Sequence, residues 1–163
     1  MLGLRTIFHV LAKGGEADLI MTLMLREDAC TYGSMLAAGA TSLWERLNEP
    51  RQVSCSHNHH MYGHVSSFLI KNLAGLDYNP TALDLNSCNI TPIFPTDIND
   101  ASAFFDSPVG RIEFSWRRNG NSIILSVTLP KEIKGEIMLP KGYTFENGKA
   151  SSSAISGEYK IIK

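Results

Sequence analysis

Residues 56–80, SHNHHMYGHVSSFLIKNLAGLDYNP, contain the point at which the hydrophobic pattern of the chain changes. Before Gly75, apolar residues recur every three or four positions, the spacing of an amphipathic helix. Ser56 is a candidate N-cap for this helix and Gly75 a candidate C′ residue. The expected buried stripe comprises Met61, Val65, Phe68, Leu69 and Leu73. From residue 78 onward apolar residues alternate between turn residues, so the stretch predicts a helix followed by a β-rich region.

Two more helices are expected on the N-terminal side. Their apolar stripes are separated by Gly14-Gly15 and comprise Leu4, Ile7, Phe8 and Leu11, then Ala17, Ile20, Met21, Met24 and Leu25. Residues 31–50 have no clear periodicity. Three helices with wide apolar faces cannot cover one another, so the helical part should belong to a larger domain and should self-associate through its exposed faces.

The C-terminal part has the pattern of an antiparallel β-sandwich. Residues 112–116 alternate between apolar and polar, Asn119-Gly120 supplies a turn, and residues 123–129 follow as the return strand. Further strands are expected near residues 135–139 and 159–162. Trp116 alternates with Phe114 and Ile112, which favours a place in the core over an exposed one.

Composition sets outer limits on function. The chain has 163 residues, a formal net charge of -1 and 44% hydrophobic residues, as expected of a globular protein. Lysine and arginine are scattered, so nucleic acid is not an expected partner. No apolar run is long enough to span a membrane. The compartment stays open, because any export signal would lie upstream of this chain.

The run Gly39-Ala40-Thr41-Ser42-Leu43-Trp44-Glu45-Arg46 places an aromatic ring beside a carboxylate. In a sugar-cleaving site these two side chains would supply a stacking face and a proton acceptor. The alternative is structural: Trp44 would belong to the core, and Glu45 would pair with Arg46 or face solvent.

Four of the five histidines fall within residues 57–64. On a helix, His57, His60 and His64 would share one face and could hold zinc, although no Asp or Glu supplies an obvious fourth ligand and the geometry of Cys55 is open. The alternatives are a solvent-facing or capping cluster, or a set of groups that bind sugar hydroxyls.

Across these motifs the chain resembles the bacterial α-L-rhamnosidases of glycoside hydrolase family 78. That family has a Gly-Ala-Thr-Thr-x-Trp-Glu run, matched by residues 39–45, and a Ser-x-Asn-His run, matched by residues 56–59. It also has an aromatic-glycine pair like Tyr32-Gly33 and a helix that ends in Leu-Ala-Gly, as at residues 73–75. Residues 105–112 resemble a Ser-Pro-x-Gly hairpin in its C-terminal β-sandwich. The resemblance covers nearly the whole chain, in order.

The resemblance implies an α+β chain in which residues 1–76 are the last helices of an (α/α)6 catalytic barrel and residues 77–163 are a β-sandwich. It implies an inverting glycoside hydrolase acting on terminal α-L-rhamnosyl residues without a cofactor. Glu45 would be the general base, and His59, Asn58, Trp44 and Tyr32 would bind the carbohydrate. The general acid would lie on earlier helices, so the isolated chain should be inactive. Ser42, Leu47 and Tyr32 depart from the common family residues, which leaves the exact sugar open.

Two other functions are weighed against this one. The sandwich could be a carbohydrate-binding module with Trp116, Tyr143 and Tyr159 as stacking platforms. The histidine cluster could make the chain a zinc-binding protein.

Overall fold

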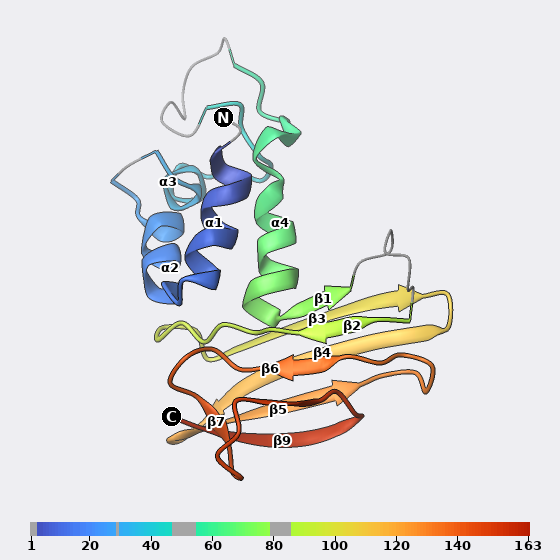
Figure 1. Ribbon diagram of the computed structural model, residues 1–163. Helices are drawn as coiled ribbons and strands as arrows, with labels where there is room; N and C mark the ends of the chain where they lie inside the picture. The colour runs from blue at the N-terminus through green and yellow to red at the C-terminus, as the bar shows by residue number, and fades with distance from the viewer. Residues whose placement is uncertain (1–2, 29, 47–54, 79–85) are drawn as a thin grey trace. The chain divides into compact units, whose positions relative to one another are not determined.

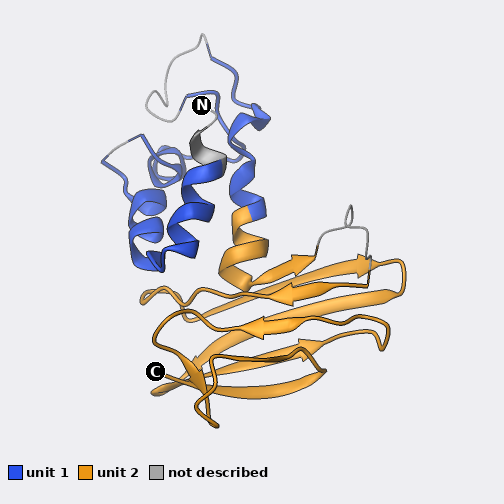
Figure 2. Cartoon of the chain, viewed as in Figure 1, with its two compact units in different colours: residues 1–67 blue, residues 68–163 orange. Residues whose placement is uncertain are grey.

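The computed structural model describes residues 3–28, 30–46, 55–78 and 86–163 (Figure 1). It has two compact units, residues 1–67 and 68–163 (Figure 2). None of the described helices is long and apolar enough to cross a membrane. The predicted domain boundary after residue 76 stays a prediction. The compact units divide earlier, after residue 67, because the last helical turns pack on strands of the second unit.

The first unit opens with the two predicted helices. Helix α1 spans Gly3–Lys13 and helix α2 spans Ala17–Leu25, separated by the two glycines as expected. Gly15 adopts a φ of 83°, which a residue with a side chain rarely does. Ile20, Met21 and Met24 are buried on α2 as predicted, whereas Leu25, at the end of the predicted stripe, is exposed.

A third helix, α3, spans Tyr32–Ala37 within the stretch that has no clear periodicity. It begins with a capping box, in which Ser34 N donates to Thr31 Oγ1 and Thr31 N to Ser34 Oγ, both at 3.1 Å. A Cβ on Gly33 would lie 2.2 Å from the carbonyl oxygen of Leu25, so only glycine lets α3 approach the end of α2 this closely.

The long helix predicted from Ser56 is wrong in its first part. Residues 60–62 form a 3-10 turn, η1 (His60–Tyr62), and the α-helix α4 spans only His64–Phe68. A π-helical segment, η2 (Leu69–Ala74), completes it. Ser56 does not cap a helix because residues 56–59 are hydrogen-bonded to residues 42–45 instead. Gly75 ends the helix as predicted, with a φ of 102°.

The second unit contains two β-sheets. One has the order β1-β2-β6-β8 and the other β3-β4-β5-β9-β7. The bounds in chain order are β1 Leu76–Tyr78, β2 Cys88–Ile90, β3 Asp100–Ser107, β4 Gly110–Asn119, β5 Ser122–Thr128, β6 Glu136–Met138, β7 Thr144–Phe145, β8 Ser151–Ser153 and β9 Gly157–Ile162. The named pairs are antiparallel except β2–β6, which is parallel. Strands β4 and β5 form the predicted hairpin.

Trp116 lies in the core of this unit, 1% exposed, as its spacing predicted. Its indole Nε1 donates to the carbonyl oxygen of Leu73 at 2.8 Å, which ties strand β4 to the end of η2. Phe94 meets its ring edge-on at 5.2 Å. A stacking platform for sugars needs an open ring face, so that alternative is wrong for Trp116. Tyr143 and Tyr159 are half-buried against Phe94 and Phe145.

Candidate functional site: the carboxylate of Glu45

Two segments of the first unit, residues 42–45 and 56–59, lie side by side. Glu45 N donates to Ser56 O at 2.8 Å, and His59 N donates to Leu43 O at 2.7 Å. The hydroxyl of Ser42 donates to the carbonyl oxygen of His57. These bonds bring together the two motifs that carry the predicted site residues.

The carboxylate of Glu45 is held by the backbone rather than by a cation. Its Oε2 accepts a hydrogen bond from Ser56 N at 3.0 Å, and the side chain is partly exposed. Among the described residues it forms no ion pair, so the alternative pairing with Arg46 is wrong. A carboxylate fixed by one neutral donor keeps an oxygen available to accept a proton.

Trp44 belongs to the core of the first unit. It is 6% exposed and packs with Met35 and Tyr62. The exposed ring of His57 stacks on it, with ring centroids 4.6 Å apart and planes 21° apart. The structural alternative is therefore correct for Trp44, and its predicted contact with sugar stays a prediction.

Tyr32 also has a structural contact. Its hydroxyl donates to the carbonyl oxygen of Tyr62 at 2.8 Å, and the two rings meet edge-on at 6.4 Å. Burial raises the pKa of Tyr32 to about 12, with a smaller contribution from Tyr62. Burial also raises the pKa of Tyr62, and the charges of Cys30 and Glu45 add to this effect. The Glu45 carboxylate therefore lies within electrostatic reach of a buried phenol.

The sugar-binding candidates on the second segment differ in exposure. His59 is partly exposed, with its ring stacked against that of His60 at 6.1 Å, whereas Asn58 is exposed. The backbone N–H of Asn58 donates to Ser56 Oγ at 3.2 Å, which fixes the turn and leaves the amide side chain outside the core.

The zinc hypothesis fails on geometry. Only His64 of the three proposed ligands lies on α4, whereas His60 lies in the 3-10 turn and His57 stacks on Trp44. Over residues 3–28, 30–46, 55–78 and 86–163, no three His, Cys, Asp or Glu side chains are grouped to hold a metal ion.

Comparison with known families accounts for most of the chain. Residues 1–73 match the bacterial α-L-rhamnosidase six-hairpin glycosidase domain, and residues 86–153 match the bacterial α-L-rhamnosidase C-terminal domain. The two matches occur in the order that the resemblance predicted. The chain belongs to the bacterial α-L-rhamnosidase family. The expected organisation, the end of a six-hairpin domain followed by a β-sandwich, is thereby confirmed.

Individual relatives carry the same name. An α-L-rhamnosidase of Formosa agariphila is 28% identical over 99% of this chain, and one of Alteromonas sp. is 27% identical over 88%. The chain covers 19% and 16% of these two proteins, so it spans less than a fifth of their length.

Solved α-L-rhamnosidases share the fold. The Dictyoglumus thermophilum structure superposes with a TM-score of 0.82 at 23% identity, over 98% of this chain and 20% of that one. The Streptomyces avermitilis structure, complexed with L-rhamnose, gives 0.80 at 23% identity, over 99% and 18%.

The sequence did not reveal two contacts within the candidate site. The stacking of His57 on Trp44 and the bond from Tyr32 to Tyr62 join residues 13 and 30 positions apart. The only signal for them was that the family motifs contain Tyr32, Trp44 and His57. Such motifs identify residues of a site but do not show which of these residues contact one another.

Proposed function

We propose that this chain supplies the general-base side of the active site of an inverting α-L-rhamnosidase, with Glu45 as the base. The observation that carries the proposal is the environment of its carboxylate. Glu45 is partly exposed, accepts a hydrogen bond from one backbone N–H, and forms no ion pair within the described residues. Its backbone is also hydrogen-bonded to the segment that contains His59. The membership of both units in the α-L-rhamnosidase family supports the same conclusion.

In this proposal Glu45 takes a proton from a water molecule while the water oxygen bonds to the anomeric carbon of the sugar. The bond to the leaving oxygen breaks on the opposite face, and that oxygen receives a proton from a general acid. An inverting site needs the two carboxyl groups roughly 6.5–9.5 Å apart, with room for the water. We infer that the acid belongs to another part of the six-hairpin domain.

His59 and Asn58 would bind the sugar hydroxyls. A neutral imidazole and an amide each offer a donor and an acceptor, which suits a polyhydroxylated ring. Trp44 and Tyr32 are the other proposed sugar-binding residues; Trp44 stacks with His57, and the hydroxyl of Tyr32 donates to the carbonyl oxygen of Tyr62. L-rhamnose is the proposed sugar, because relatives are named α-L-rhamnosidases and one was solved with L-rhamnose.

The experiment tests Glu45 in a complete active site. A chimera would carry residues 1–163 in place of the matching part of the Streptomyces avermitilis enzyme, with the unfused chain as the blank. Removing a general base slows turnover by about 10²–10⁴-fold, so Glu45→Ala should lose most hydrolysis of an aryl α-L-rhamnoside. Added azide should restore turnover and give the β-L-rhamnosyl azide, because azide attacks without needing a base.

The matched control is Glu27→Gln, a change at another exposed carboxylate of the same unit. It should leave turnover unchanged. A folded Glu45→Ala chimera that keeps full activity, or that gives no azide product, would rule out the general-base role.

A further inference from the structure

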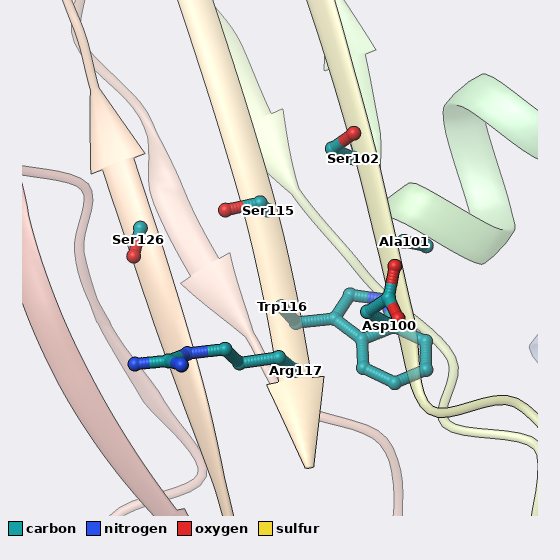
Figure 3. A pocket seen from close by; sticks show the side chains of 7 residues that line it. All are labelled: Asp100, Ala101, Ser102, Ser115, Trp116, Arg117 and Ser126. Atoms are coloured by element: carbon teal, nitrogen blue, oxygen red, sulfur yellow. The ribbon is translucent and has the colours of Figure 1, made fainter.

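The second unit has a hollow of about 290 Å³ on its five-stranded sheet. Figure 3 shows it from close by, over strands β3, β4 and β5. It is lined by Asp100, Ala101, Ser102, Ser115, Trp116, Arg117 and Ser126. Trp116 is buried and its N–H is already bonded, so the hydroxyl and charged groups are the ones a ligand would meet.

The strand register explains the hollow. Ser102 lies opposite Ser115 on β3 and β4, and Ser115 lies opposite Ser126 on β5. Residues directly opposite each other point to the same face of a sheet. Three short side chains therefore form one row across three strands. Phe104 is the next β3 residue on this face, and it is 57% exposed.

The two cross-strand pairs of opposite charge beside this row differ from each other. Asp106 and Arg111, which lie opposite each other on β3 and β4, form a two-point ion pair at 2.8 and 3.2 Å. Asp100 and Arg117 are also opposite each other but form no ion pair within the described residues. Figure 3 shows Arg117 extending over β5, away from Asp100.

We propose that this hollow, the serine trough, binds a neutral carbohydrate. Its lining presents the Asp100 carboxylate, the Arg117 guanidinium and three serine hydroxyls, and at its edge Ser126 Oγ donates to Glu158 Oε1 at 3.3 Å. Donors and acceptors thus alternate along the trough, which suits a ligand rich in hydroxyl groups. Its volume is at the small end of ligand sites, which fits one or two sugar rings. The lining offers no open aromatic face, so binding rests on hydrogen bonds and is weak.

This proposal goes beyond the proposed hydrolysis and does not depend on it. The serine trough binds and does no chemistry, and its residues belong to the second unit, whereas Glu45 and His59 belong to the first. Each proposal can therefore fail alone.

Ligand-observed saturation-transfer NMR on the 163-residue chain tests the trough, with L-rhamnose, cellotetraose and maltotetraose as probes. At least one probe should give a saturable signal. Arg117→Met removes donors from the rim, and Ser115→Leu fills the floor; each should weaken binding by about tenfold. Arg117 is exposed, so its variant should fold even if the Ser115 variant does not.

Arg111→Met is the matched control, because it removes a guanidinium from the same strand and the same face outside the trough. It should leave binding unchanged. No saturable signal from any probe overturns the proposal. So does binding that Arg117→Met leaves intact, or that only His59→Ala weakens, which would assign the sugar to the first unit.

Discussion

Tyr32 has structural contacts that its motif did not predict. The family resemblance places it among carbohydrate-binding residues, yet its hydroxyl is bonded to the backbone of Tyr62 and its ring packs between Phe8 and Tyr62. Nothing in the sequence links positions 32 and 62. The identity of a site residue can be inferred from a motif, whereas its hydrogen-bond partner depends on a fold that the motif does not describe.

Tyr32→Phe should lower the free energy of unfolding by about 1 kcal/mol, because the buried carbonyl of Tyr62 loses its donor. The measurement is urea unfolding followed by circular dichroism. Tyr143→Phe is the control, since its hydroxyl donates to no atom in the described part of the chain. Equal stability of the two variants would contradict the prediction.

The same residue should make stability depend on alkaline pH. The pKa of Tyr32 is raised from 10.0 to about 12, chiefly by burial, so the folded state favours the neutral phenol. The contribution of Tyr32 to the free energy of unfolding is complete below pH 10, where the phenol is neutral in the unfolded state too. This contribution is lost as the pH rises through about 12, the pKa in the folded state. The melting temperature of the parent chain should therefore fall more steeply over this range than that of Tyr32→Phe.

At the scale of elements, prediction succeeded where periodicity is local. Helices α1 and α2 and the β4–β5 hairpin follow from spacing and turn residues alone. Helix α3 was missed because six residues with a glycine inside give too few apolar repeats, although Thr31 and Ser34 form a recognisable cap. The start of the third helix was misplaced because residues 56–59 pair with residues 42–45. The parallel β2–β6 pair and the serine trough depend on register between distant strands.

Gly75, at the junction of η2 and β1, supports a prediction about stability. A Cβ there would lie 2.5 Å from the backbone nitrogen of Pro92, and φ is 102°. Gly75→Ala should cost roughly 3 kcal/mol, from backbone strain plus the clash. Gly120→Ala, at a φ of 60° with no atom within 4 Å, should cost only about 1 kcal/mol. Thermal unfolding of both variants measures the difference, and equal costs would refute the role given to Pro92.

At the scale of the whole molecule, the two-part organisation and the family were predicted from sequence, because the motifs run through nearly the whole chain in order. The exposed apolar faces of the helices also follow from the pattern. Val10 is 59% exposed on α1 and Leu36 is 64% exposed on α3. Such faces need a partner, which in the six-hairpin family would be neighbouring helices.

The chain by itself should therefore self-associate, as the sequence predicts. In sedimentation velocity, the double variant Val10→Lys/Leu36→Lys should shift the distribution toward monomer. Ile155→Lys is the control, because Ile155 is equally prominent at 66% exposure but belongs to the second unit. A parent chain that sediments as a single stable monomer would contradict this expectation.

Two of the four hydrogen bonds that join residues 42–45 to residues 56–59 run between main-chain atoms, and on the second segment all four use only main-chain atoms. Amide and carbonyl groups are the same in every amino acid except proline, so substitutions other than proline at Leu43 or His57 leave the hydrogen bond from Ser56 N to the Glu45 carboxylate in place. The side chain stacked on Trp44 at position 57 can therefore change while the Glu45 carboxylate, the proposed proton acceptor, keeps its place. A laboratory library at these positions should yield altered sugar preference far more often than dead protein.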